Sequence, residues 1–183
     1  MNRIVLLSIT VLAAVCLVPA GTSSALEKTI GKLTVTSSAF KDGGMIPRKY
    51  TADGANVSPP LAISGIPTAA KSLAIICDDP DAPRGTFVHW VLFNWPSGSK
   101  SIPENVPTKE RLPNGAIQGK NDFGKIGYGG PAPPYGVHRY YFKAYALDKM
   151  LDLKPGITKR QLEDAMKGHI LAQGHIMGRY GRK

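Results

Sequence analysis

Two segments of this chain carry side chains that could bind or transform a small polar molecule. The first, residues 78–90, places three carboxylates in a proline-rich turn and then His89 on an apolar run. The second, residues 130–140, is a glycine- and proline-rich loop that leads to His138 and Tyr140. Histidines donate hydrogen bonds and carry charge near neutral pH, and a tyrosine hydroxyl is a further donor. The combination predicts a small polar pocket.

The second segment also predicts which side chains share a face. If His138 begins a strand, His138 and Tyr140 point to one side and Arg139 to the other, because side chains alternate along a strand. Each piece alone has a structural explanation, since Asp-Pro turns are common and a single histidine in an apolar strand is more often structural. The two histidines, the acidic turn and the loop together are harder to explain by packing.

Other chemistries fit the sequence less well. It has no Gly-x-Ser-x-Gly elbow, Walker loop, dinucleotide fingerprint or His-Glu-x-x-His motif. A metal site is conceivable from four residues: Asp79, Asp81, His89 and His138. Their spacing matches no standard ligand pattern, so we rank a metal below plain ligand binding. We expect Cys77, before the acidic turn, to be a buried thiol with a raised pKa and low reactivity.

The elements that must position these residues are short strands joined by glycine and proline turns. Strands or extended segments are predicted over residues 30–37, 59–63, 72–77, 87–95, 138–146 and 176–180. One helix is predicted late in the chain, where Thr158 and Gln161 form a capping box, apolar residues recur from Leu162 to Ile170, and Gly174 ends it. This pattern predicts a mainly β domain, an antiparallel β-sandwich with a few short peripheral helices.

A long aperiodic stretch lies between Thr108 and Gly136. A loop longer than about 12–15 residues in a compact domain is usually functional or disordered. This one contains aromatic side chains and a rigid run from Pro131 to Pro134, so we expect it to be ordered against the site.

The chain is strongly basic, with a formal net charge of +10. Its lysines and arginines are scattered, without a basic helix or an aromatic-interleaved stripe, so we predict no nucleic-acid partner. Such a surface favours anionic ligands or peripheral membrane contact. The dense cluster at residues 179–183 is predicted to be a solvated tail.

The first 25 residues have the order of a secretory signal peptide: a short positive start, an apolar run, and small residues before Ala25. A membrane anchor is the weaker alternative because the run is short and interrupted. A lipoprotein signal at Cys16 is disfavoured by Val15. Cleavage after Ala25 leaves one domain, residues 26–183, with Cys77 as its single cysteine and hence no internal disulfide. The predicted location is periplasmic or secreted.

The two segments are similar to the two signatures of the phosphatidylethanolamine-binding protein family. The matching residues are Asp79-Pro80-Asp81-Ala82-Pro83 with His89-Trp90, and Gly130-Pro131-x-Pro133-Pro134-x-Gly136-x-His138-Arg139-Tyr140. Further matches in order and spacing include Phe40–Pro47, Tyr50–Leu61, Gly119-x-Asn121 and Tyr145–Asp148, so the likeness extends over nearly all of residues 26–183. It is closest to the bacterial, Raf kinase inhibitor-like branch.

The resemblance implies a β-sandwich with an anion pocket at one edge of a sheet. By motif position, the pocket would be lined by Asp79, His89, His138 and Tyr140. Pro80 and Pro83 would shape its wall, with a cis Ala82–Pro83 peptide, and the loop starting at Gly130 and Pro131 would form its rim. Ala132 stands where bacterial members often have cysteine, a small change that should leave the backbone alone.

The function implied is binding of a small anionic ligand, phosphate-like or a phospholipid headgroup, without catalysis, cofactor or metal. A homodimer is an expectation by analogy with bacterial members. Two alternatives stay open: an enzyme acting on a phosphoester-type substrate, and a protein-interaction role such as protease or kinase inhibition. The sequence lacks the C-terminal helix of eukaryotic members, and together with export this argues against kinase regulation.

Overall fold

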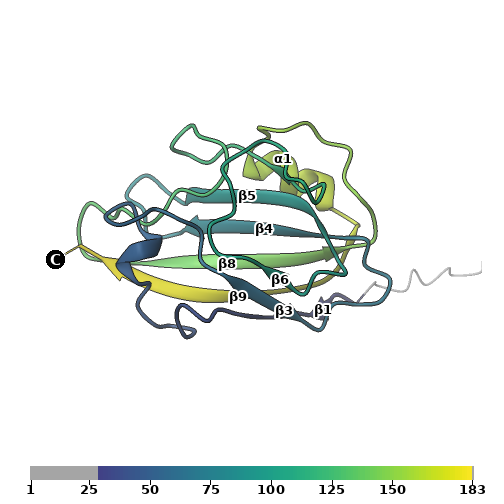
Figure 1. The fold of residues 1–183 in the computed structure, drawn as a ribbon, viewed down its shortest axis with the longest axis horizontal. Coiled ribbons are helices and arrows are strands. Elements are labelled where there is room, and N and C mark those ends of the chain that lie inside the picture. The colour runs from purple at the N-terminus through teal and green to yellow at the C-terminus, as the bar shows by residue number, and fades with distance from the viewer. Residues whose placement is uncertain (1–28, 183) are drawn as a thin grey trace, which may run out of the picture.

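The computed structural model describes residues 29–182 (Figure 1). The predicted signal peptide, residues 1–25, lies outside the described residues. The elements in chain order are β1 (Gly31–Lys32), β2 (Thr34–Thr36), the 3-10 turn η1 (Arg48–Tyr50), β3 (Leu61–Ser64), β4 (Ser72–Asp79), β5 (Phe87–Pro96), β6 (Ser101–Ile102), β7 (Ile117–Gln118), β8 (Val137–Leu147), α1 (Lys159–Met166) and β9 (Ile170–Gly181). Between residues 29 and 182, no helix is long and apolar enough to cross a membrane.

The strands form two sheets. The larger has the order β1-β9-β8-β4-β5-β7, and the smaller has the order β2-β3-β6. Neighbouring strands are antiparallel, except that β1 pairs in parallel with β9. The predicted antiparallel β-sandwich is therefore confirmed, with one short parallel pair added.

The main core lies between the two sheets, and a second apolar cluster lies where α1 packs on the larger sheet. Ile63 of β3 and Ile102 of β6 belong to the same cluster as Ile75 of β4. On the α1 side, Leu162 packs with Ile76 of β4. Because β4 is covered on both faces, all of its residues are buried, and its sequence reads as a continuous apolar run rather than an alternating one.

The strand predicted over residues 30–37 is two short strands in different sheets. β1 pairs with β9, whereas β2 pairs with β3. Between them, the buried Leu33 donates its N–H to the carbonyl of Gln173 at 2.8 Å. The two backbone segments approach so closely that a Cβ on Gly174 would lie 2.0 Å from the Leu33 carbonyl oxygen, so this position requires glycine.

Helix α1 begins as predicted but ends earlier. The capping box at residues 158–161 is confirmed, with both reciprocal hydrogen bonds present. The helix stops at Met166, and Gly168 with a positive φ of 78° reverses the chain. Ile170 then starts β9, and Gly174 lies inside that strand. The predicted extension to Ile170 was wrong because a short apolar pattern suits either a helix or a half-buried strand.

Residues 179–181 are part of the larger sheet, which corrects the prediction of a solvated tail at residues 179–183 for the described part of that segment, residues 179–182. β9 pairs with β8 as far as Gly181. Arg182 contacts the Asp53 carboxylate at 2.9–3.0 Å, and the Tyr180 hydroxyl donates to the same carboxylate at 2.9 Å. These hydrogen bonds lower the pKa of Asp53. The ladder with β8 and these contacts tie the basic residues to the fold.

Candidate functional site

The two segments singled out from the sequence meet at one end of the larger sheet. β4 ends at Asp79, β5 begins at Phe87 and β8 begins at Val137. Since β4 pairs antiparallel with both β5 and β8, its end lies beside the beginnings of both neighbours. In Figure 1 this is the end of the sheet near the C-terminus.

A β-bulge at His89 turns its ring toward the side of the sheet that carries Tyr140. Cys77 pairs with Trp90, but the next residue of β4 pairs with Val88, so His89 is an extra residue without a partner on β4. The ring centroids of His89 and Tyr140 lie 5.1 Å apart in an edge-to-face arrangement. Regular alternation along β5 would not have predicted this orientation.

Asp79 and His138 form a buried pair. His138 Nδ1 lies 2.7 Å from Asp79 Oδ2, and each side chain is only 5% exposed. The other carboxylate oxygen accepts the backbone N–H of Asp81 at 2.8 Å. Because a carboxylate accepts, Nδ1 of His138 carries a proton and Nε2 is the nitrogen left for another partner. Asp79 thus orients a histidine, which explains a carboxylate in a site expected to bind anions.

His89 is held by the backbone of the glycine-rich loop. Its Nδ1 lies 2.6 Å from the carbonyl oxygen of Gly129, which can only accept, so Nδ1 donates and the neutral ring keeps its lone pair on Nε2. Burial lowers the pKa of His89 from its usual 6.5, opposed by the Gly129 carbonyl and the charge of Asp79. His89 is therefore neutral at pH 7 in the free protein.

The Tyr140 hydroxyl is buried and forms no hydrogen bond of normal geometry among the described residues, although the Asp79 carboxylate is close enough to act on it. Tyr140 is 0% exposed, and burial together with the charge of Asp79 raises the pKa of its hydroxyl. An unpartnered buried hydroxyl costs about 1–3 kcal/mol. The hydroxyl is thus a donor that a bound molecule could satisfy.

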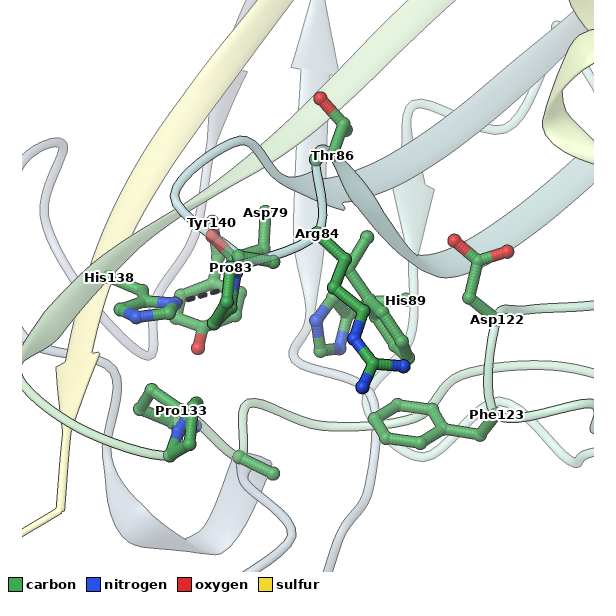
Figure 2. A pocket seen from close by; sticks show the side chains of 15 residues that line it. Asp79, Pro83, Arg84, Thr86, His89, Asp122, Phe123, Pro133, His138 and Tyr140 are labelled. Carbon is green, nitrogen blue, oxygen red and sulfur yellow. Dashed lines mark hydrogen bonds and ion pairs between the residues drawn. The ribbon is translucent and has the colours of Figure 1, made fainter.

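These side chains line a cavity of about 380 Å³. Figure 2 shows two groups along it: Asp79, Pro83, Pro133, His138 and Tyr140 on one side, and Arg84, His89, Asp122 and Phe123 on the other. The walls combine proline and aromatic side chains with charged and polar groups from both segments and from the loop after β7. Cavities of this size and composition hold small organic ligands.

Five of the eight predicted site residues line the cavity: Asp79, Pro83, His89, His138 and Tyr140. The other three, Pro80, Gly130 and Pro131, are not part of its lining. Gly130 and Pro131 instead anchor the loop. The N–H of Gly130 donates to Asn56 Oδ1 at 2.7 Å, and the carbonyl of Pro131 accepts the N–H of Ala52 at 3.0 Å. The next residues, 132–134, form the wall.

The turn after β4 contains only trans peptide bonds, which corrects the expected cis Ala82–Pro83 bond. No cis peptide is present in residues 29–182. The turn is closed instead by a hydrogen bond from the N–H of Gly85 to the carbonyl of Ala82 at 3.1 Å. Gly85 has a φ of 98°, a conformation open to glycine that lets the chain reverse without a cis proline.

Asp81 belongs to a clip beside the cavity. It accepts hydrogen bonds from Arg139 Nη2 at 2.6 Å, from Arg139 Nε at 2.9 Å and from the Arg139 backbone N–H at 2.9 Å. These bonds lower the pKa of Asp81 to about 2. As alternation predicted, Arg139 is exposed while its neighbours His138 and Tyr140 are buried.

Asp81, one of the four residues considered as metal ligands from the sequence, is hydrogen-bonded to Arg139. No group of three or more metal-ligating side chains is found in the described part of the chain. Cys77 is fully buried, and burial with the neighbouring Asp78 and Asp79 raises the pKa of its thiol, as expected.

The sequence analysis missed one side of the cavity, formed by Arg84, Thr86, Phe87, Asp122 and Phe123. Phe123 belongs to the aperiodic stretch predicted to order against the site, and that stretch does contribute cavity-lining residues. No local signal marked Asp122 or Arg84. Asp122 reaches the cavity because the chain after β7 runs along the free edge of β5, where the N–H of Asp122 donates to the Val88 carbonyl at 2.9 Å. Arg84 lies in the turn between β4 and β5.

Comparisons with known proteins identify the family. The model of a family described as phosphatidylethanolamine-binding protein matches residues 36–181. A UPF0098 protein of Methanothermobacter thermautotrophicus is 53% identical over 150 residues, which cover 82% of this chain and 99% of the relative. A UPF0098 protein of Aquifex aeolicus is 46% identical over 153 residues, covering 82% of this chain and 89% of that protein.

Two solved structures are also similar. A phosphatidylethanolamine-binding protein homolog from Chlamydia trachomatis is 42% identical, with a TM-score of 0.77, covering 84% of this chain and 99% of that one. YbcL from Escherichia coli, described as a member of the mammalian family, is 32% identical with a TM-score of 0.77, covering 84% of this chain and 100% of its own. The chain belongs to the phosphatidylethanolamine-binding protein family. Within that family it is a member of the bacterial type.

Proposed function

We propose that this protein binds a small anionic ligand, a phosphate-like group or a phospholipid headgroup, in the cavity between β4, β5 and β8. The observation that carries the proposal is the His138 ring, whose Nδ1 is held by Asp79 at 2.7 Å, beside the unpartnered hydroxyl of Tyr140. His138 Nε2 and the Tyr140 hydroxyl are hydrogen-bonding groups that lie together at one side of a concave site.

The charges of the site favour a phosphate-like group that carries a proton. His138 paired with Asp79 donates through Nε2 when protonated, and Tyr140 donates through its hydroxyl. Neutral His89 keeps a lone pair on Nε2, which accepts a hydrogen bond from a P–OH group. Asp79 offsets part of the positive charge, so a monoprotonated phosphate fits better than a fully ionised sulfate.

Anion affinity should rise as the pH falls. The pKa of His89 is lowered in the free protein, so this ring gains its proton only below its usual 6.5, and a bound anion favours the protonated form. When His89 becomes charged, it adds a charge-assisted hydrogen bond to the ligand. Affinity should therefore be higher at pH 6 than at pH 8.

The test is calorimetric titration of inorganic phosphate and phosphoethanolamine at pH 6 and pH 8. His138→Ala should weaken phosphate binding by roughly tenfold or more, the value of a hydrogen bond to a charged group. His169→Ala is the matched control, because His169 pairs with Asp148 at 2.9 Å in a half-exposed histidine–carboxylate pair outside the cavity. Equal binding by the wild type and His138→Ala at both pH values would rule out the proposal.

Binding is preferred to catalysis because no serine or cysteine is among the residues that line the cavity. Cys77 lies in the core with a raised pKa. Turnover of generic phosphoesters by the wild type, absent in His89→Ala, would favour an enzyme instead.

The proposal includes export, to the periplasm or outside the cell, on the strength of the signal-peptide pattern in residues 1–25. The basic composition supports contact with anionic ligands or membrane surfaces. A regulatory role and a homodimer complete the proposal by analogy with bacterial relatives.

A further inference from the structure

The cavity is larger than a phosphate group requires. Its volume of about 380 Å³ lies in the range of roughly 300–1,000 Å³ typical of cavities for small organic ligands, whereas a phosphate has five non-hydrogen atoms. The polar donors His138 and Tyr140 belong to one side, together with Asp79 (Figure 2). The other side of the same cavity is available to whatever the phosphate is attached to.

That other side is an aromatic cluster. The ring centroids of Phe87 and Phe123 are 4.8 Å apart in an edge-to-face arrangement. The His89 ring lies 5.2 Å from Phe87 and 5.4 Å from Phe123. Such rings present faces and edges to a further apolar group, and each aromatic contact adds about 0.5–1.5 kcal/mol beyond burial alone, roughly two- to tenfold in affinity.

Phe123 is held in place although it is 42% exposed. The buried Asn121 organises its loop: Asn121 Oδ1 accepts the N–H groups of Phe123 and Lys125 at 3.1 and 3.0 Å, and Asn121 Nδ2 donates to the Gly127 carbonyl at 2.9 Å. Phe123 also lies directly against the backbone of Gly129, where an added Cβ would be 2.6 Å from its ring. The position of the exposed Phe123 ring is thus fixed by its loop and by the Gly129 backbone.

The adjacent residue fastens this loop to β5. The N–H of Asp122 donates to the Val88 carbonyl at 2.9 Å, and Asp122 Oδ2 accepts the Val88 N–H at 2.7 Å. The loop that carries Phe123 is therefore attached to β5, the strand that also carries His89. The aromatic side of the cavity adjoins the polar side directly, because the rings of His89 and Tyr140 lie 5.1 Å apart.

The charges near the aromatic cluster are balanced. Arg84 and Asp122 both line this side of the cavity, as Figure 2 shows. Arg84 forms no ion pair within residues 29–182, and the opposite charges of Arg84 and Asp122 leave this side without a net preference for either sign of charge. An uncharged apolar group buries against the two phenylalanines.

Building on the proposed function, we infer that the ligand is a phosphate ester with an uncharged, ring-sized apolar substituent. The phosphate occupies the His138 and Tyr140 side, and the substituent packs against Phe87 and Phe123. Phe123 is the residue that selects for the substituent, because its partly exposed ring lines the cavity and packs on Phe87.

The test compares methyl phosphate, phenyl phosphate, phosphoethanolamine and inorganic phosphate by calorimetry at pH 6. Phenyl phosphate should bind about tenfold more tightly than methyl phosphate, and Phe123→Ala should reduce this ratio to about twofold without changing affinity for inorganic phosphate. Phe123→Leu, which keeps apolar bulk, should give an intermediate ratio. Met150→Ala, which removes an exposed apolar side chain outside the cavity, is the control and should leave the ratio unchanged.

The outcomes separate this inference from the proposed function. Phosphate binding with equal affinities for methyl and phenyl phosphate, unaffected by Phe123→Ala, would overturn the inference and leave the proposed function standing. Tighter binding of phosphoethanolamine than of phenyl phosphate would also overturn it, because that side would then select a cation. Failure of every phosphate to bind would overturn the proposed function itself.

Discussion

The polar atoms of the cavity differ in how fully they are satisfied. Asp79 has both carboxylate oxygens engaged, one by His138 and one by the Asp81 N–H. His89 is anchored through Nδ1. The Tyr140 hydroxyl alone of these groups has no partner in the described residues. A buried polar group without a hydrogen-bond partner destabilises the free protein. Such groups are typical of binding sites, where the ligand supplies the missing partner.

At the residue scale, Tyr140→Phe should therefore stabilise the protein and weaken its ligand binding. Removing the unpartnered hydroxyl should raise the free energy of unfolding by about 1 kcal/mol, and loss of its hydrogen bond should lower phosphate affinity by roughly tenfold. Urea denaturation and calorimetry measure the two effects. Tyr145→Phe, on the half-buried outer side of β8, should change neither quantity. A Tyr140→Phe variant that is less stable would show that the hydroxyl already has a partner.

At the scale of elements, α1 is joined to the larger sheet by charge as well as by apolar packing. Asp78, 1% exposed, accepts hydrogen bonds through Oδ2 from Lys143 of β8 at 2.8 Å and from Lys159 of α1 at 2.5 Å. Asp78 Oδ1 has no partner among the described residues. Two lysines compensate one buried carboxylate, so this contact is sensitive to the loss of both.

Replacing Lys143 and Lys159 together by methionine should destabilise the protein by about 3–5 kcal/mol, because Asp78 would keep a buried charge without compensation. Thermal and chemical denaturation measure this loss. Lys167→Met removes the exposed pair with Asp164 at the end of the same helix and should have no measurable effect. A double variant as stable as the wild type would show that water satisfies Asp78.

At the scale of the whole molecule, the cavity rests on a core shared by both sheets. Cys77 lies in that core next to the acidic turn, with 0% exposure, and belongs to the same cluster as Trp90 of β5 and Ile63 of β3. Local opening of a loop does not expose a residue in this position. Its thiol therefore reports on unfolding of the sandwich as a unit.

In a chain that starts at Leu26, without the predicted signal peptide, Cys77 is the single cysteine. It should react with a soluble thiol reagent only as fast as the protein unfolds. Burial raises the pKa of the thiol, so little thiolate exists in the folded state even at alkaline pH. The rate of labelling should match the unfolding rate followed by tryptophan fluorescence. Prompt labelling of folded protein, at the rate seen in denaturant, would contradict the assigned core position.

Much of the site could be predicted from the sequence because its signals are local. Asp79, His89, His138 and Tyr140 stand in dense motifs, and the period of two along β8 correctly placed His138 and Tyr140 on one buried side. The apolar run of residues 72–77 predicted a strand, and β4 forms there and is buried along its length. These inferences depend on residues close in sequence, where backbone geometry leaves few alternatives.

The remaining features were decided by tertiary structure. The pairing of Asp79 with His138 depends on β4 and β8 lying side by side, and the orientation of His89 depends on a bulge relative to β4. Phe123 reaches the cavity because its loop follows the free edge of β5, and no periodicity records that path. The sequence by itself determined the class of fold and the polar half of the site. Only contacts between distant segments decided the register, the apolar half and the partners of each polar atom, because those follow from which strands pair and not from what any one strand contains.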